Sequence, residues 1–520
     1  MDMIGFKGQV QEGLYHTKDV FAILWNRVNG TACLVGVSAS LAVYWLIKKT
    51  RYRLPPGPVA LPLVGNYSLL GDSRLHETCA RLSAIYGPVI TIQIGPLKMV
   101  VLNTIEATIE AMVTKGTDFA NRPVTASGML LSDGGKNILL SQYTPTWKLH
   151  RKIASKALRN SLRGEKQETA LDASMAEFIT LLTATEGQPF TPHAYIDHAL
   201  FNLMSGLCFK KVYQFNDKTF KRFIDVDNEF IREFGLGLIE DVFPILAIWP
   251  SQRFQKVIGL LTEILQFTYD RFQEHVDDFD ADDIKDISDF VIMARKEAEE
   301  EENAELLDQL TDEHLRQIVT DVFFAGFETS RFTLTWGLLY LAGHPEVQKR
   351  AQLEMDEVVG RARLPTLKDR SSLPYTEAVL HEVMRVATVS PLGIPHAARV
   401  DSMICGYDIP KGTTVAINHW ALHNDPRYWD QPQKFNPERF LTSEGKLAPI
   451  PDSWVPFSVG RRVCIGESAS KPELILILSV ILHQFNIKLP PGVAADYSPE
   501  ASGLAGYIAN RYKIQAEKRE

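Results

Sequence analysis

A ten-residue stretch near the C-terminus, residues 457–466, restricts the local fold more than any other part of the chain. It reads F-x-x-G-x-R-x-C-x-G, and an apolar helical run follows at 474–485. Backbone N–H groups and a helix N-terminus lower the pKa of a nearby thiol, so this placement favours a thiolate at Cys464. Gly460 and Gly466 allow the loop to lie close under a flat group, where a Cβ would obstruct.

A thiolate held in this way is an electron-rich axial ligand for haem iron and favours cleavage of the O–O bond of dioxygen. Arg462, two residues before Cys464, can reach a haem propionate. The stretch resembles the cysteine loop of the cytochrome P450 superfamily at every motif position, and the resemblance implies that Phe457, Gly460 and Gly466 also border the haem b group. Because a lone cysteine is more often a buried structural thiol, this interpretation needs agreement elsewhere in the chain.

Length and composition narrow the class of protein. The 520 residues are 45% hydrophobic, enough to bury a large core, and no Gly/Ser-rich or Pro-rich linker divides the chain after residue 58. A net charge of −8 gives no basic footprint, which argues against a nucleic-acid partner. Five cysteines without a C-x-x-C spacing indicate neither a zinc site nor a disulfide framework, and this usage suits a reducing compartment.

The N-terminal region contains a candidate membrane anchor. Residues 31–47 are 17 uncharged positions, the short end of the range for a transmembrane helix, and four basic residues follow within 48–53. The positive-inside rule then puts the C-terminal side in the cytosol. A cleaved signal peptide is disfavoured because its charges would precede the apolar run. Residues 54–58, LPPGP, form a stiff extended spacer.

Together these features predict a domain order. We expect a short luminal segment at 1–30, a single-pass anchor at 31–47, a basic and proline-rich hinge at 48–58, and one haem-binding monooxygenase domain at 59–520. The hinge resembles that of membrane-bound cytochromes P450, which implies an endoplasmic reticulum membrane location with a cytosolic catalytic domain.

The spacing of apolar residues predicts a mainly α chain with small β-sheets, in keeping with the cytochrome P450 fold that the loop implies. Val89 to Leu102 alternates around Gly95-Pro96 and predicts two strands. Short strands are also expected near 397–417 and in the last 40 residues. Helices are expected at 74–86, 104–115, 145–158, 168–185, 195–209, 218–235, 255–276, 284–302, 312–342, 345–359, 373–387 and 467–483.

The helix expected at 312–342, with Thr311 as a possible N-cap, has polar residues in its middle. The run 325–330 reads A-G-F-E-T-S, and a glycine there costs up to about 1 kcal/mol relative to alanine. It resembles the family motif that forms a groove over the face of the haem where dioxygen binds. The resemblance implies that Glu328 and Thr329 deliver protons, with Ala325 and Gly326 forming the groove. The alternative is a kinked core helix with satisfied polar groups.

Two further sets of residues agree with this interpretation. Glu382 and Arg385 share one helix face, and Arg439 lies in a later F-N-P-E-R-F run. By resemblance these three form a buried structural triad that supports the cysteine loop. The resemblance also implies a ring of propionate-binding residues consisting of Arg122, Trp147, Arg151, His396 and Arg462. Each member alone would more commonly be a surface charge or a satisfied core group.

Three positions depart from the family pattern. Ser470 stands where alanine is usual, and Pro472 removes a backbone donor from the second turn of the following helix. Both bear on haem geometry. Phe327, expected above the haem by resemblance, is bulky and would narrow the pocket.

Within the family the chain is most similar to the animal microsomal branch of steroid 17-alpha- and 21-hydroxylases. The similarity rests on the runs 390–396 and 412–423 and on Asn202, a position that implies contact with the A-ring oxygen of a steroid. Our main hypothesis is insertion of one oxygen atom of O2 into a lipophilic, steroid-like substrate. The alternatives are the same chemistry on aromatic xenobiotics, and a haem-thiolate isomerase or binding protein that does not activate oxygen.

Because the sequence shows no flavin or nicotinamide module, electrons must come from another protein. The resemblance implies NADPH–cytochrome reductase, with cytochrome b5 as a further candidate. The expected docking face is cationic and includes Arg461, Lys471 and the helix at 145–158.

Overall fold

The computed structural model describes Gly36 and residues 52–61, 64–66, 69, 72, 74–161, 165–235, 237–501 and 506–520. The chain forms two units, of which the first combines residues up to Leu54 with Tyr407–Ile409 and the second holds the rest. In the first unit, Arg53 and Asp408 exchange hydrogen bonds, with Arg53 N–H 2.7 Å from Asp408 Oδ2. The expected anchor at 31–47 lies outside the described residues, apart from Gly36. Within the described ranges, every helix is too short or too polar to cross a bilayer.

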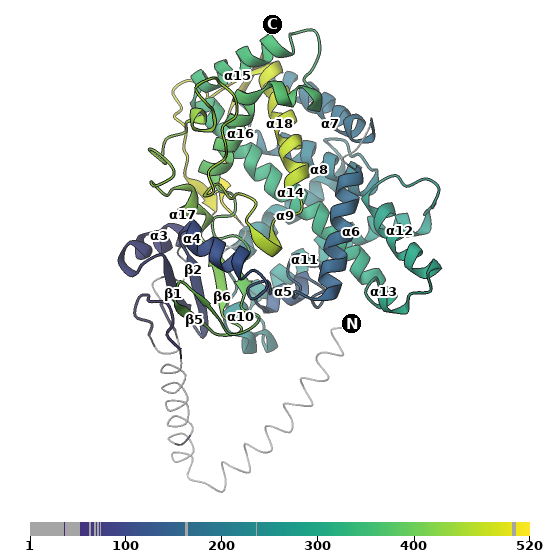
Figure 1. The fold of residues 1–520 in the computed structure, drawn as a ribbon. Helices are drawn as coiled ribbons and strands as arrows, with labels where there is room; N and C mark the ends of the chain where they lie inside the picture. Colours follow the sequence, from purple (N-terminus) through teal and green to yellow (C-terminus); the bar gives the residue numbers. More distant parts are fainter. Residues whose placement is uncertain are drawn as a thin grey trace. The chain divides into compact units, whose positions relative to one another are not determined.

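The second unit is mainly helical, as expected, and Figure 1 shows its helices gathered around α14. Their bounds are α3 Leu75–Tyr86, α4 Ile105–Ile109, α5 Ala126–Leu131, α6 Pro145–Ser161, α7 Glu165–Thr183, α8 His193–Phe209, α9 Lys218–Gly235, α10 Ile239–Val242, α11 Gln252–Asp277, α12 Ile287–Glu300, α13 Ala304–Asp308, α14 Asp312–Gly343, α15 Pro345–Val358, α16 Pro374–Ala387, α17 His419–His423 and α18 Glu467–Gln484.

Each range in which we expected a helix contains one, usually with ends within three residues of the prediction. The range 104–115 differs, because α4 continues as a π-helical turn over Glu110–Thr114. The expectations missed α5, α10, α13 and α17. These helices have four to six residues, too few to establish a helical period in the sequence.

Helix α14 is the centre of the core and contacts α6, α8, α11, α12, α15, α16 and α18. Most of its residues are buried, since neighbouring helices cover nearly every side. Thr311 occupies the N-cap position in extended backbone, yet its side chain caps no backbone N–H and instead donates to Glu313 Oε2 at 2.8 Å. The expected capping by the Thr311 side chain is therefore wrong.

The largest sheet has four strands in the order β1-β2-β6-β3. β1 (Val89–Ile94) and β2 (Leu97–Leu102) form the expected hairpin, paired from Val89 opposite Leu102 to Ile94 opposite Leu97. β2 runs parallel to β6 (Thr414–Ile417), and β6 is antiparallel to β3 (His396–Ala397). The remaining strands are β4 Ser402–Ile404, β5 Tyr407–Ile409, β7 Phe485–Lys488, β8 Pro499–Ala501, β9 Ile508–Ala509 and β10 Gln515–Lys518.

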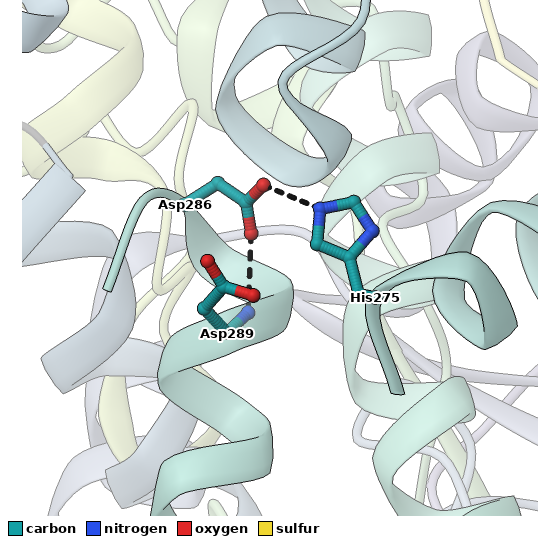
Figure 2. Close-up of side chains that lie close together, drawn as sticks. All are labelled: His275, Asp286 and Asp289. Atoms are coloured by element: carbon teal, nitrogen blue, oxygen red, sulfur yellow. Dashed lines mark hydrogen bonds and ion pairs between the residues drawn. The ribbon is translucent and has the colours of Figure 1, made fainter. Parts of the chain in front are cut away.

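The connection from α11 to α12 brings three potential metal ligands together, as Figure 2 shows. Asp286 caps α12 by accepting the Asp289 N–H at 3.1 Å, and its other oxygen lies 2.6 Å from His275 Nε2. Asp289 accepts the Lys285 N–H at 2.9 Å. These contacts are those of a helix cap and an ion pair, and they account for the arrangement without an ion.

Candidate active site

The cysteine loop between η6 (Gly460–Arg462) and α18 folds tightly against the π-helical turn after α4. Gly460 has φ of +84°, and a Cβ there would lie 2.0 Å from the Met112 carbonyl oxygen. Only glycine satisfies both conditions without strain. The Cys464 N–H donates to the Phe457 carbonyl at 3.0 Å and closes the loop. Gly466 leaves room beside the sulfur, because a Cβ would sit 3.6 Å from Cys464 Sγ.

The Cys464 side chain is exposed, although the loop around it removes enough water to raise the pKa of the thiol. The Glu467 carboxylate raises this pKa as well, whereas three groups lower it: the N–H groups of Gly466 and Glu467, at the start of α18, and the Arg151 guanidinium. The backbone donors and the cation expected from the sequence are therefore present, but burial and Glu467 outweigh them.

Three guanidiniums gather next to this loop, and we call Arg122, Arg151 and Arg462 the cationic cluster. Arg122 and Arg462 are only 6% and 7% exposed. Burial and the neighbouring cations lower the pKa of Arg122 to about 9 and that of Arg462 to about 8, which shows how unfavourable these charges are here. Among the described residues, none of the three forms an ion pair with a carboxylate.

Backbone carbonyls accept some of the hydrogen bonds that the cationic cluster can donate. Arg462 donates to three carbonyls at 2.6–3.1 Å, Arg122 to three at 2.6–3.0 Å, and Arg151 to the Val463 carbonyl at 2.5 Å. A guanidinium has five N–H donors, so donors remain on each. Buried cations with spare donors and no carboxylate partner fit an anionic ligand such as the paired propionates of haem.

The other two residues of the expected ring lie beside the cationic cluster. The Trp147 ring sits 4.1 Å from the Arg462 guanidinium carbon, and its N–H donates to the Ile138 carbonyl at 2.9 Å. His396 is buried, with Nδ1 2.9 Å from the Phe119 carbonyl oxygen, and burial beside Arg122 lowers its pKa well below the usual value. The structure thus brings the five expected residues to one place.

One face of α14 is open in its middle. Ala325 and Thr329, one turn apart, are exposed, whereas the residues on both sides of this segment are mostly buried. The Thr329 hydroxyl donates to the Ala325 carbonyl at 2.7 Å, the helix-bending bond that the sequence suggested. A Cβ at Gly326 would lie 2.6 Å from Cε at the flexible end of the Met204 side chain on α8. The glycine therefore leaves room for that side chain.

The Glu328 side chain does not point to the open face of α14 on which Thr329 lies. Its carboxylate lies 3.1 Å from Arg331 Nη2, and the same guanidinium lies 2.9 Å from Asp227 and 3.7 Å from Asp197. Burial and the two neighbouring acids raise the pKa of Glu328 well above its usual value. Glu328 and Thr329 are thus neighbours in sequence with different surroundings.

Two expected substrate contacts are not supported. Phe327 is fully buried against Phe201, Phe223 and Phe323, on the side of α14 away from Ala325 and Thr329. A helix advances 100° per residue, so Phe327 cannot share their face. The Asn202 amide exchanges hydrogen bonds of 2.8 Å with the backbone of Tyr213 and so fixes the position of the chain that follows α8. Its role is that of a buried structural amide.

The structural triad forms as expected. Arg385 makes a bidentate pair with Glu382 at 2.7 and 2.8 Å, and Arg439 Nε donates to the same carboxylate at 3.1 Å. Arg385 also donates to the His423 carbonyl at 2.8 Å, and Glu382 accepts the Asn436 N–H at 2.8 Å. The network ties α16 to the segment that leads toward the cysteine loop.

Sequence reasoning missed two acids that position this site. Asp321 on α14 accepts the N–H groups of Ile138 and Leu139 at 2.6 and 3.0 Å, and so holds the segment whose carbonyls bind the cationic cluster. Asp227 on α9 forms an ion pair with Arg331 and lies beside Glu328. For Asp227 the signal available was Arg331, an arginine three residues after Glu328 at the start of the mainly apolar second half of the helix, which requires buried acids as partners.

Comparison with known proteins agrees with this geometry. The sequence model described as Cytochrome P450 matches residues 55–516. The chain is 36% identical over 468 residues to the steroid 17-alpha-hydroxylase/17,20 lyase of Gallus gallus, covering 89% of this chain and 91% of that protein. It is 33% identical over 489 residues to cytochrome P450 1A1 of Canis lupus familiaris, covering 91% and 93%.

Proposed function

Because this chain belongs to the cytochrome P450 family, whose members are monooxygenases with a cysteine-ligated haem, we propose that Cys464 is the thiolate ligand of the iron. The observation that carries this assignment is the cationic cluster, since its buried and uncompensated charges lie beside the loop of an exposed cysteine. When bound, the haem supplies the activation of dioxygen.

Residues of this chain hold the haem and deliver protons. Arg122, Arg151 and Arg462 hold the propionates, and Trp147 and His396 complete that ring. Thr329 offers its hydroxyl on the open face of α14, where it accepts and passes on a proton. Glu328 supplies that proton after its side chain turns away from Arg331. Ala325 keeps the open face free of bulk.

The substrate we propose is lipophilic and steroid-like, and one oxygen atom of O2 is inserted into it. The support is the similarity to steroid 17-alpha-hydroxylase/17,20 lyases, which extends to that of Squalus acanthias at 33% identity over 494 residues. A planar aromatic substrate is the second candidate, supported by the similarity to cytochrome P450 1A1. Since the two identities, 36% and 33%, are close, substrate titration must separate the two candidates.

Electrons reach the haem from a separate reductase that uses NADPH, and we propose that the cationic proximal face receives it. Arg461, Lys148 and Lys152 are exposed on this face, whereas Lys471 already pairs with Glu467 at 2.7 Å. Cytochrome b5 is a further proposed partner. We also propose that residues 31–47 anchor the protein in the endoplasmic reticulum membrane with its catalytic domain in the cytosol.

Spectroscopy of the purified, haem-loaded protein tests the ligand. The reduced carbon monoxide complex should show the strongly red-shifted Soret band of thiolate ligation, and Cys464→His should lose this band while keeping haem. Cys405→Ser, a change at the other exposed cysteine of the described residues, is the matched control and should keep it. A wild-type protein that binds haem without the red shift would contradict the assignment.

A titration of the ferric protein tests the substrate. Progesterone and pregnenolone should displace iron-bound water and shift the spectrum from low to high spin. A shift with planar aromatics and none with any steroid would favour the second candidate. A protein with normal thiolate spectra that forms product from neither class, despite receiving electrons, would indicate an isomerase or binding protein instead.

A further inference from the structure

A second cluster of buried charges lies where α8, α9 and α14 meet. Its centre is Arg331, whose guanidinium lies 2.9 Å from Asp227, 3.1 Å from Glu328 and 3.7 Å from Asp197. Asp227 and Arg331 are 1% and 4% exposed, so water contributes little to their solvation. The guanidinium also lies over the Phe327 ring at 5.0 Å, which holds it in place.

The charges of this cluster do not balance if every acid is ionised. Three carboxyls share one guanidinium, and two further groups face them, His193 on α8 and Arg511 near the C-terminus. Burial and the two arginines lower the pKa of His193 to about 4, so it adds no charge at neutral pH. Because uncompensated charge is costly in a dry interior, at least one carboxyl of the cluster holds a proton.

Contacts indicate which carboxyl holds it. Neither oxygen of Glu328 nor Oδ2 of Asp227 has a hydrogen-bond partner among the described residues, although the two carboxyls lie 3.1 and 2.9 Å from the same nitrogen, Arg331 Nη2. Two carboxylates so close together repel each other when both are ionised, and we assign the proton to Glu328 because Asp227 lies closer to Arg331. Burial raises the pKa of both acids, and that of Glu328 is raised further by its neighbours. One proton between the two carboxyls therefore removes the repulsion at Arg331.

We propose that Asp227 is a positioning residue for proton delivery: it accepts a hydrogen bond from the protonated Glu328 and holds that acid on the α9 side of α14. The inference rests on the proton-donor function proposed for Glu328. On delivery Glu328 turns from Arg331 toward Thr329, and its O–H bond breaks as the Thr329 hydroxyl accepts the proton. The carboxylate then returns to Arg331, where a proton from water restores the acid. Asp227 therefore determines how readily Glu328 turns toward Thr329 and releases its proton.

The decisive measurement is the infrared titration of the Glu328 carboxyl in the resting, haem-loaded protein, which requires no turnover. Glu328→Gln identifies the band. Asp227→Asn keeps the size of the side chain and removes its charge, and Arg331 retains two acids, so we expect the variant to fold. The Glu328 band should then titrate at a pH lower by about one unit or more, as for strongly coupled acids. Asp227→Glu, the conservative control, should restore a midpoint near that of the wild type.

Three outcomes would overturn the inference. The first is an unchanged Glu328 midpoint in a folded Asp227→Asn protein. The second is a Glu328 midpoint in Asp227→Glu that is lowered as much as in Asp227→Asn. The third, which does not depend on either Asp227 variant folding, is a wild-type protein without a protonated-carboxyl band that Glu328→Gln removes. The proposed function fails separately, when Glu328→Gln leaves the yield of product per NADPH unchanged while the infrared results hold.

Discussion

At the scale of single residues, the most informative feature is a set of charges that the described protein atoms do not neutralise. Arg122 and Arg462 are buried and bind only backbone carbonyls, an arrangement that weakens the fold unless an anion joins it. Thr329 and Ala325 contribute the opposite feature, an exposed patch on a buried helix. Both make sense as the surroundings of one flat, anionic ligand.

Removing one buried charge should separate folding from haem binding. Arg122→Gln should leave the melting temperature of the haem-free protein unchanged or raised, because a desolvated cation is lost. Haem should dissociate at least about tenfold faster, since a hydrogen bond to a charged group contributes roughly 1.5–3 kcal/mol. Arg461→Gln, at an exposed position of the cysteine loop, is the control and should change neither quantity. Lower haem-free stability with unchanged haem retention would refute this account.

Removing the Thr329 hydroxyl should affect proton delivery alone. Thr329→Ala should lower the yield of product per NADPH by about tenfold or more, because positioned proton transfer contributes factors of roughly 10²–10⁴. The carbon monoxide spectrum should not change. Thr333→Ala is a matched control, since Thr333 makes the same bond one turn later, to the Thr329 carbonyl at 2.8 Å, but is buried. Equal yields in the two variants would exclude Thr329 from the relay.

At the scale of elements, α14 and α18 hold the two sides of the site and both carry locally unfavourable residues. In α14, Gly326 leaves room for the end of the Met204 side chain. In α18, Pro472 lies inside the helix and removes the N–H that would pair with the Ser468 carbonyl. The Ser470 hydroxyl beside it is buried without a hydrogen-bond partner among the described residues.

Restoring the missing backbone donor should therefore stabilise α18. Pro472→Ala should raise the free energy of unfolding by roughly 1–3 kcal/mol, the range for a proline in a helix interior. Thiolate ligation should be unaffected, because the Cys464 loop precedes the substituted turn. Ser470→Ala, which removes the unpartnered hydroxyl, should change stability much less. Chemical denaturation and the carbon monoxide spectrum measure both effects, and a destabilised Pro472→Ala would show that the bend is needed for packing.

At the scale of the whole molecule, buried acids make stability depend on pH. Burial raises the pKa of Glu473 from 4.5 to about 8, and it raises those of Asp197 and Asp321 to about 6 and about 7. At these three acids the folded chain holds protons that the unfolded chain has already lost, so their contribution to the free energy of unfolding falls as the pH rises from about 4 to about 8. Buried histidines such as His76 and His381, whose pKa burial lowers to about 4, contribute in the opposite direction below about pH 6.5.

Glu473 should account for a measurable part of this slope. Glu473→Gln should remove the Glu473 contribution and so give a flatter dependence of the unfolding free energy on pH between about 6.5 and 8, with a gain of a few kcal/mol at the upper end. Asp321 and the buried histidines keep their own contributions. The exposed Glu444→Gln serves as the control and should reproduce the wild-type curve. Parallel curves for wild type and Glu473→Gln would show that the folded protein ionises Glu473 without cost.

Much of the architecture and part of the site follow from local sequence. Helices longer than about ten residues repeat their apolar positions often enough to be located, and the cysteine loop is contiguous, so Gly460 and Cys464 are recognisable without a structure. The partners of Glu382 could also be predicted, because Arg385 shares its helix face and Arg439 lies in a recognisable run. In each case the information lies within a few neighbouring residues.

Tertiary packing alone decided what the polar residues of α14 and α8 contact. Helical periodicity sets the angle between Phe327, Glu328 and Thr329 but not which neighbour each angle meets. The contact with α9 turns Glu328 toward Asp227, about a hundred residues away in sequence. The backbone of Tyr213, in the chain after α8, forms the hydrogen bonds of the Asn202 amide. Sequence thus determined that a cysteine loop, cations and a long helix with polar residues in its middle exist, and long-range packing determined which way their side chains point.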